Sequence, residues 1–223
     1  MTLKSVNNNY GNLKHARELV LHLGMTGRLS VRDAADRSAP GPHQRARWQL
    51  DDGRTFLFDD IRRFGRIAVL RAGDHASLPT LAALGPEPFD EAFTPERLRT
   101  MVNRSSRAVK TQLLSQRVVA GVGNIYADEA LWRSQVHPAA RKLTRAQAER
   151  LRDAVVQVLT EAVTNGGTTL RDYRTVRGTY GSNQHNLDCY GQAGLPCGRC
   201  GTPLHRVVVD ARSTTFCRVC QRR

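Results

Sequence analysis

The segment CGRCGTPLHRVVVDARSTTFCRVC, residues 197–220, determines the fold of the C-terminal part of the chain. It holds two C-x-x-C pairs, Cys197 with Cys200 and Cys217 with Cys220, separated by sixteen residues. Two residues between thiolates allow both sulfurs of one tight turn to face one metal ion, and two such turns complete a tetrahedral zinc site. A pair of disulfides is the alternative, which an intracellular protein disfavours. We predict one structural zinc ion, because four thiolates leave no open position for water or substrate.

The residues between and before these cysteines extend the prediction. Alternating and β-branched side chains at 205–209 and 214–216 predict a β-hairpin that joins the two pairs. Cys189 stands eight residues before the first pair and has no C-x-x-C partner of its own. We expect a small buried apolar residue there, with a reactive thiol as the alternative.

The charge of the chain indicates what it binds. Its 223 residues carry 34 Lys plus Arg against 20 Asp plus Glu, a formal net charge of +14. All but four of the positive side chains are arginines, whose planar fork binds phosphate bidentately. Such a surplus favours a polyanion, because neutralised phosphates release condensed counterions. Codon usage in a GC-rich genome is the alternative explanation. Charge therefore indicates a nucleic-acid partner without separating DNA from RNA.

Membrane and secretory signals are missing from the sequence. No stretch approaches the roughly 20 apolar residues that span a bilayer. The first nine residues contain no apolar core of signal-peptide length. We expect a cytoplasmic protein with no membrane partner.

The hydrophobic pattern changes along the chain from strands to helices. Alternation predicts strands at 19–23, 45–50, 55–58 and 65–70, with a loop over 32–42. Thr94 then caps a helix that has Pro95 at its first position. Further helices are predicted over 108–116, from about Asn124, and after the capping box that Thr144 forms with Gln147. The fold class is α+β, with domains at 1–92, 93–186 and 187–223.

Four segments in a fixed order carry a more specific signal. They are His22-Leu-Gly-Met-Thr-Gly27, Asp60-Ile-Arg-Arg-Phe-Gly65, Gly121-Val-Gly-Asn-Ile-Tyr-Ala-Asp-Glu129, and the cysteine-containing tail from Tyr190 to Cys220. Together they resemble the formamidopyrimidine-DNA glycosylase and endonuclease VIII family. The resemblance implies a β-sandwich whose front segment is missing, a helix–two-turn–helix domain, and a zinc-finger hairpin, with DNA between the first two.

The resemblance also implies a function. Members of this family flip a damaged base out of the duplex, cut its glycosidic bond and nick the strand. We expect a base-excision DNA glycosylase and abasic-site lyase that acts as a monomer on damaged double-stranded DNA. Its substrates would be oxidised purines such as formamidopyrimidine and 8-oxoguanine, and strand cleavage would proceed by β,δ-elimination.

Three side chains match the family positions that fill the hole left by the flipped base. They are Met25, Arg62 and Phe64, and a thioether, a guanidinium and an aromatic ring suit a wedge between bases. An ordinary core is the alternative for Met25 and Phe64. The adjacent pair Arg62-Arg63 favours an exposed loop tip.

Further positions match family residues that contact the DNA backbone. His22 and His43 match histidines that line the DNA, although an isolated histidine is more often a plain surface residue. Lys110 matches a phosphate-binding lysine, and Asn124 matches a phosphate ligand at a helix start, where a plain N-cap is the alternative. Arg212, between the cysteine pairs, matches the arginine that grips phosphates around the flipped nucleotide and assists the elimination. The zinc ion would hold Arg212 rigid.

The start of the chain departs from the family pattern. Family members use an N-terminal proline as nucleophile and the adjacent glutamate as acid and base. This chain opens Met1-Thr-Leu-Lys4 and has no carboxylate before Glu18. Three interpretations stay open: an enzyme whose start lies upstream, a catalytically dead or lyase-only relative that binds damaged, abasic or nicked DNA, and an incomplete chain with an open sheet edge. In the second, the amine of Thr2, Lys4 or Lys14 would form a Schiff base.

Two positions leave further alternatives open. Glu129 matches a family glutamate near the DNA, but a pair with an arginine is an equal alternative, so it is not part of the predicted site. The loop 173–186 corresponds to the one that covers the flipped base and lacks the usual aromatic residue after Gly181. The preferred lesion stays open.

Overall fold

The computed structural model describes residues 17–170, 175 and 178–222. Thr2, Lys4 and Lys14, the candidate amines, lie outside the described residues. The chain divides into two compact units, one of residues 1–82 and 165–184, the other of residues 83–164 and 185–223.

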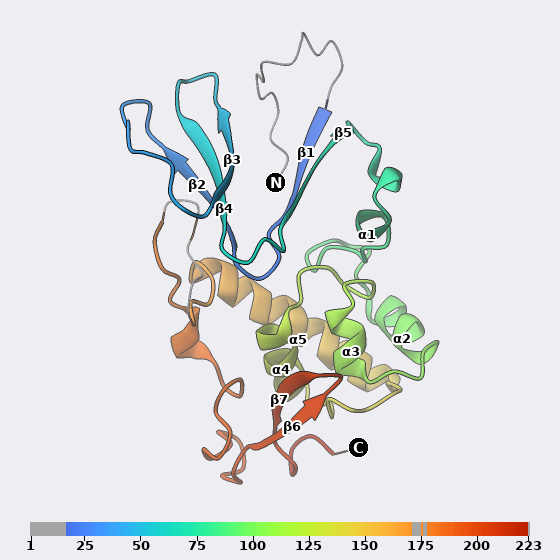
Figure 1. The fold of residues 1–223 in the computed structure, drawn as a ribbon. Coiled ribbons are helices and arrows are strands. Elements are labelled where there is room, and N and C mark those ends of the chain that lie inside the picture. The colour runs from blue at the N-terminus through green and yellow to red at the C-terminus, as the bar shows by residue number, and fades with distance from the viewer. Residues whose placement is uncertain (1–16, 171–174, 176–177, 223) are drawn as a thin grey trace. The chain divides into compact units, whose positions relative to one another are not determined.

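The first unit contains five strands in two antiparallel sheets (Figure 1). β1 (Arg17–His22) pairs with β5 (Arg66–Arg71). In the other sheet β4 (Thr55–Asp60) lies between β2 (Gly27–Arg32) and β3 (Gln44–Gln49).

An aromatic core joins the two sheets. Trp48, Phe56 and Phe58 are buried, and Leu19 and Leu21 of β1 pack against them. Alternating apolar residues on β1 and β4 therefore face one another across the unit, which confirms the predicted β-sandwich. Short helical segments follow β5 or precede the C-terminal region: η1 (His75–Ser77), α1 (Pro79–Ala82) and η2 (Asn183–Asn186).

Four helices form the core of the second unit: α2 (Pro95–Asn103), α3 (Val109–Leu114), α4 (Asn124–Arg133) and α5 (Arg145–Thr164). The predicted caps are present. Thr94 Oγ1 accepts the amide of Arg97 at 3.1 Å. At α5, Gln147 N donates to Thr144 Oγ1 at 3.2 Å and Thr144 N donates to Gln147 Oε1 at 2.9 Å, which is the reciprocal capping box.

The apolar stripe of α5 packs against α2 and α4, and its buried members include Leu151, Val155 and Leu159. α3 is shorter than the predicted 108–116. Gln116 leaves the helical region with a φ of 62°, and its side-chain amide turns back to accept the amide of Gly121 and donate to the carbonyl of Val122, each at 2.7 Å. This turn ends α3 and sets the start of α4.

The C-terminal hairpin lies beside α3 and α4 (Figure 1). β6 (His205–Val209) pairs antiparallel with β7 (Arg212–Phe216). Asp210 and Ala211 form the two-residue turn, with φ values of 49° and 60°, the twist that such a tight hairpin requires. The hairpin prediction is confirmed, and the α+β fold class with it. In the described part of the chain, no helix has the length and apolar character needed to cross a bilayer.

Candidate functional site

Met25, Arg62 and Phe64, called here the loop cluster, project from two neighbouring loops of the first unit. Met25 is 67% exposed and Phe64 is 57% exposed. The Arg62 guanidinium lies 2.6 Å from the Met25 sulfur and 5.2 Å from the centre of the Phe64 ring. Since both apolar side chains stand out in solvent, the structure excludes the core alternative for them.

Asp60 holds these two loops together. Its carboxylate is buried and accepts the Thr26 hydroxyl at 2.5 Å and the Gly65 amide at 2.8 Å. The Thr26 oxygen in turn accepts the amide of Arg62 at 3.1 Å. The hydrogen bond from Thr26 and the amide of Gly65 lower the pKa of Asp60, so the charged form locks the base of the loop cluster.

The backbones of the two predicted histidines lie next to the segment that begins with Asp60. His22 is exposed at the end of β1. Gly65 passes close to the backbone of His22, since a Cβ atom added at Gly65 would lie 3.1 Å from the His22 carbonyl oxygen. His43 is exposed, and its carbonyl accepts the amide of Asp60 at 2.9 Å. The backbones of His22 and His43 therefore adjoin the segment Asp60–Gly65 that carries Arg62 and Phe64.

The four paired cysteines form one cluster in the second unit. The Sγ atoms of Cys197, Cys200, Cys217 and Cys220 all lie within 4.8 Å of one another. A tetrahedral zinc site with bonds of about 2.3 Å places its sulfurs about 3.8 Å apart. The cluster has this size, and four thiolates form a closed structural zinc site.

The pKa values of the cluster thiols are shifted in both directions. The hydroxyl and amide of Thr202 lower the pKa of Cys200 to about 6. Burial raises the pKa of Cys217, and that of Cys220 to about 12. These two thiols therefore stay protonated near neutral pH until a bound cation displaces their protons into solvent, and zinc affinity falls in acid because the protons compete with the metal.

Two side chains tie the zinc knuckles to the helices. The buried side chain of Gln221 donates to the carbonyl of Val136 at 2.9 Å and accepts the amide of Cys217 at 2.8 Å. Arg199, inside the first knuckle, lies 3.9 Å from the centre of the Trp132 ring and donates to the carbonyls of Trp132 and Arg133 at 2.5 and 2.9 Å. The guanidinium satisfies backbone oxygens at the end of α4.

Lys110, Asn124 and Asp128, called here the hairpin anchor, hold the outer edge of β7. Lys110 Nζ lies 2.6 Å from Asp128 Oδ1 and donates to the Ser213 carbonyl at 2.9 Å and to Thr214 Oγ1 at 2.8 Å. Asn124 Nδ2 donates to the same Ser213 carbonyl at 3.1 Å. Asp128 Oδ2 accepts the amide of Thr215 at 2.9 Å.

Three side chains therefore take the place of a third strand along β7. A lone two-stranded hairpin leaves one edge of each strand unpaired, and on β7 side chains from α3 and α4 satisfy successive backbone groups. Arg212 stands directly before this held segment, with an exposed side chain. The anchor fixes the backbone from which Arg212 projects.

The Lys110–Asp128 pair lies in the interior, with 0% and 1% of the two side chains exposed. Burial raises the pKa of Asp128 to about 6 and lowers that of Lys110, in each case against the attraction of the partner. This burial differs from the sequence expectation that Lys110 contacts phosphate directly. Its ammonium is enclosed by β7 and Asp128. Lys110 can therefore affect a ligand at the surface only by fixing the position of the hairpin.

Asn124 and Glu129 differ from the alternatives drawn from sequence. The cap position of α4 is occupied by Gly123, and Asn124 is the first helical residue, so Asn124 is not a plain N-cap. Glu129 is buried and forms no ion pair with an arginine of the described part of the chain. Its carboxylate accepts the amides of residues 188, 189 and 190 at 2.7 to 2.9 Å, which fixes the segment that leads into the first zinc knuckle.

Cys189 is buried, as predicted. Its thiol donates to the Thr215 carbonyl at 3.0 Å. Burial raises its pKa, so the thiol stays protonated and unreactive.

Sequence models of three protein families match the chain in succession. The formamidopyrimidine-DNA glycosylase N-terminal domain matches residues 8–67, and the formamidopyrimidine-DNA glycosylase H2TH domain matches residues 84–174. A zinc finger found in FPG and IleRS matches residues 194–223. The three matches follow the order of the sheets, the helices and the zinc hairpin.

Similar proteins extend these matches over almost the whole chain. The formamidopyrimidine-DNA glycosylase of Deinococcus radiodurans is 44% identical over 211 residues, which cover 93% of this chain and 72% of that protein. The enzyme of that name from Thermus thermophilus is 49% identical over 208 residues, which cover 92% and 75%. This chain belongs to the formamidopyrimidine-DNA glycosylase family.

Solved structures of formamidopyrimidine-DNA glycosylases share the fold. The MutM (FPG) protein of Thermus thermophilus superposes with a TM-score of 0.82 at 47% identity, covering 92% of this chain and 76% of that one. The Lactococcus lactis Fpg bound to DNA that contains an abasic site gives a TM-score of 0.83 at 30% identity, covering 99% and 83%. A mutant of that protein with Fapy-dG in its DNA gives the same score, identity and coverage. The family assignment, the fold class and the structural zinc ion predicted from sequence are confirmed.

Sequence reasoning missed the buried carboxylates of this glycosylase-family chain. Asp60 opens the motif that contains Arg62 and Phe64, and Asp128 stands beside Glu129 in the motif that contains Asn124. Their positions inside both motifs were the available signal. Their partners are 34 residues away for Asp60 and Thr26, and 87 residues away for Asp128 and Thr215, which no local pattern reveals.

Proposed function

We propose that the chain is a base-excision DNA glycosylase and abasic-site lyase that acts on oxidised purines, formamidopyrimidine and 8-oxoguanine among them. The exposed loop cluster carries this proposal. Exposed Met and Phe side chains with an arginine between them suit a gap in stacked bases better than they suit water. DNA that contains Fapy-dG or an abasic site is bound by the Lactococcus lactis relatives, which supports the substrate class.

The loop cluster fills the space that a flipped base leaves. Met25 and Phe64 supply apolar surface, and Arg62 lies against both, so its guanidinium stacks and reaches the edge of the orphaned base. Asp60 and Thr26 hold the two loops at a set separation. The wedge is therefore formed before DNA arrives, and little ordering entropy remains to be lost on binding.

Phosphate contacts come from both units. His22 and His43 contact the backbone beside the loop cluster, and Arg212 grips the phosphates around the flipped nucleotide and assists elimination. Asn124 lies next to the Gly121–Gly123 turn. One hydrogen of its side-chain amide is donated to Ser213, and the other donates to a further phosphate. For Lys110 we propose an indirect role, in which its ammonium sets the position of Arg212.

The reaction uses an amine. A neutral amine attacks C1′ of the flipped nucleotide, the base departs, and the resulting Schiff base permits elimination of the 3′ and then the 5′ phosphate. Within this sequence the α-amine of Thr2 and the side chains of Lys4 and Lys14 are candidates for a lyase-only reaction, in which the amine condenses with the open aldehyde of an abasic sugar and water leaves. The zinc ion takes no part in these steps and serves the fold of the hairpin.

Borohydride trapping tests the activity. The chain is incubated with three duplexes that carry 8-oxoguanine, formamidopyrimidine or an abasic site, and the Schiff base is reduced to a stable adduct. Adducts on all three support the full function, and peptide mapping then identifies the amine. Adducts on the abasic duplex alone indicate a lyase without base excision. Absence of any adduct, with tight binding to abasic DNA in the same sample, overturns catalysis and leaves a binding protein.

Substitution of Arg212 tests the phosphate grip. Arg212→Ala should weaken abasic-DNA binding about ten- to a hundredfold, the effect of losing a charged hydrogen bond, with zinc content unchanged. Arg206→Ala is the control for charge, because it removes an equal charge from β6 of the same hairpin, together with one hydrogen bond from Arg206 Nε to Ser213 Oγ. Zinc loss in the Arg212 variant alone would assign Arg212 a structural role.

A further inference from the structure

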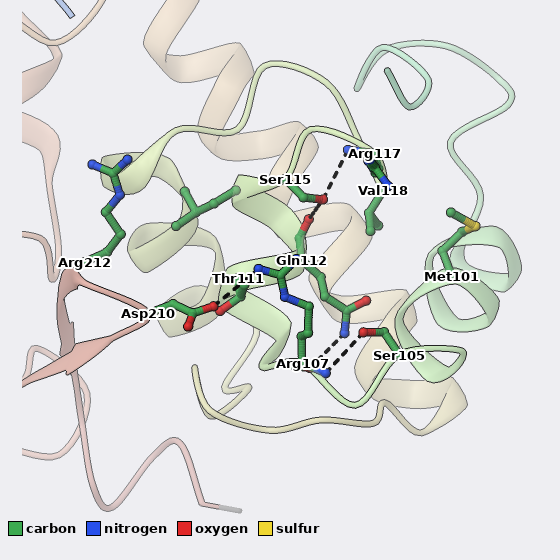
Figure 2. A pocket seen from close by; sticks show the side chains of 11 residues that line it. Met101, Ser105, Arg107, Thr111, Gln112, Ser115, Arg117, Val118, Asp210 and Arg212 are labelled. Carbon is green, nitrogen blue, oxygen red and sulfur yellow. Dashed lines mark hydrogen bonds and ion pairs between the residues drawn. The ribbon is translucent and has the colours of Figure 1, made fainter. Parts of the chain in front are cut away.

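A second basic feature lies next to Arg212. A pocket of about 690 Å³ opens beside the hairpin turn within the second unit (Figure 2). Its wall is built from the end of α2, the loop after it, one face of α3, the loop after α3 and the hairpin turn. Its lining includes Met101, Arg107, Thr111, Arg117, Asp210 and Arg212.

The charge of this pocket is positive, with three arginines against one aspartate. Arg107 and Asp210 form a loose ion pair of 3.7 Å in which 64% and 57% of the two side chains are exposed. In Figure 2 this pair spans the pocket from the loop after α2 to the hairpin turn. Among the described residues no carboxylate forms an ion pair with Arg117 or Arg212. Two guanidiniums at the pocket therefore lack a counter-charge.

A buried hydroxyl at the pocket is also without a partner. Thr111 is 7% exposed and lines the pocket, and its Oγ1 makes no hydrogen bond with any described residue. Buried hydroxyls in folded proteins are almost always paired. An unpaired one at the wall of a cationic pocket points to a ligand that carries acceptor oxygens.

We propose that this pocket binds a phosphodiester of the DNA backbone, next to the one that Arg212 holds, through Arg107 and Arg117. The inference rests on the proposed function, since it assumes that Arg212 contacts DNA. Arg212 belongs both to the hairpin and to the pocket wall, so a strand held by this side chain continues into or past the pocket. Met101 and other apolar side chains of the wall leave room for the sugar beside the phosphate.

Asp210 regulates this site by competing with the phosphate for Arg107. A phosphodiester that enters replaces the Asp210 carboxylate as the partner of Arg107, and Asp210 turns to solvent. The loose, exposed geometry of the pair makes this exchange easy, because such pairs contribute little. A bound phosphodiester has two free oxygens that can accept hydrogen bonds from Arg107 and Arg117 together, whereas the Asp210 carboxylate pairs with Arg107 alone.

The first experiment measures salt dependence. Binding is followed by fluorescence anisotropy on a duplex with one tetrahydrofuran abasic analogue, over a range of salt concentrations. Arg107→Ala and Arg117→Ala should each lower the slope of log K against log salt by about one and weaken binding several-fold. Arg145→Ala, a charge loss on α5 away from the pocket, is the control and should leave the slope almost unchanged. Slopes of the two pocket variants that equal the control overturn the proposal.

The second experiment adds a variant that keeps the fold. Asp210→Asn suits the turn, because asparagine is favoured where φ is positive in a tight hairpin. It removes the competing charge and should tighten binding about two- to fivefold, an increase that disappears when Arg107→Ala is added. Unchanged or weaker binding by Asp210→Asn overturns the competition.

The third experiment locates the phosphate. Single phosphates flanking the abasic analogue are replaced by uncharged methylphosphonates, one duplex at a time. The proposal expects one position at which Arg117→Ala causes no further loss, whereas it still weakens binding at the others. Equal losses at every position overturn a specific contact. Borohydride trapping at saturating abasic DNA separates the pocket proposal from the proposed lyase function. Loss of the pocket contact leaves trapping by Arg107→Ala and Arg117→Ala intact. Failure of the proposed function abolishes trapping in the unsubstituted chain.

Discussion

Lys110→Met is the change that tests the hairpin anchor most directly. Met has nearly the length of the lysine side chain and fills the same buried space without its charge. The change removes three contacts at once: the 2.6 Å pair with Asp128 and the hydrogen bonds to Ser213 and Thr214. Asp128, 1% exposed, is left as a buried carboxyl group without its cation.

The expected loss of stability follows from that burial. Removal of one partner from a buried ion pair costs about 3–5 kcal/mol, because the other charge stays in the interior. Lys110→Met with Asp128→Asn removes both charges, and the asparagine oxygen still accepts the amide of Thr215. The double variant should lose only about 1–3 kcal/mol, the contribution of the missing hydrogen bonds, so the two substitutions should couple by about 2 kcal/mol or more.

Urea unfolding with zinc present measures these differences. Helices α2 to α5 all belong to the second unit, so far-ultraviolet circular dichroism follows that unit. The loss in Lys110→Met should be smaller at about pH 5 than at about pH 7, because the unpaired Asp128 takes up a proton below its raised pKa. A loss under about 1 kcal/mol, or a double variant as unstable as the sum of the single ones, would refute the argument.

Four further outcomes are expected. The stability of the unsubstituted chain relative to Asp128→Asn should fall as the pH rises from about 4 through about 6. Burial raises the pKa of Asp128 to about 6, so in this range the folded state holds a proton that the unfolded state releases near about 3.9. A relative stability that grows with pH in the same urea unfolding contradicts this. Removal of zinc by a chelator should abolish the difference in abasic-DNA affinity between the unsubstituted chain and Arg212→Ala, measured by anisotropy, and a difference that persists would show that the metal does not hold the hairpin. Thr26→Val should lower that affinity about three- to tenfold by releasing the loops that Asp60 joins, and equal affinity would mean that the loop cluster is set by other contacts. Glu129→Ala leaves three buried amides without an acceptor, so hydrogen exchange at 188–190 should accelerate by orders of magnitude, whereas exchange at the rate of the unsubstituted chain would contradict the role of this carboxylate.

The elements that sequence predicts well are those with local signals. The capping box at Thr144 and the apolar stripe after it define α5 without reference to any other segment. The cysteine pairs and the β-branched residues between them define the zinc hairpin in the same way. β2 has a weaker local signal, because Leu29 and Val31 alternate with polar residues over only six residues before a loop that contains glycine and proline.

The candidate site is less accessible to such reasoning. Exposed members such as Met25 and Phe64 could be named only through the family resemblance, because their residue types by themselves favour an ordinary core. Buried polar members could not. Lys110 carries no mark of its burial, since a lysine on a helix is normally solvated, and its enclosure depends on a strand more than a hundred residues later. Polar groups of the interior are defined by partners distant in the chain.

The way β7 is held limits how freely its zinc finger could be exchanged. The matching type of finger is found in FPG and in IleRS, which suggests a module that moves between proteins. In this chain, however, the outer edge of the hairpin is completed by Lys110, Asn124 and Asp128 on helices of another segment. A finger moved into a chain without these three side chains would keep its metal ligands and leave the backbone groups of Ser213 and Thr215 without these partners. Transfer of the finger alone would therefore move the metal site without the support of its outer strand, whereas transfer together with α3 and α4 would move both.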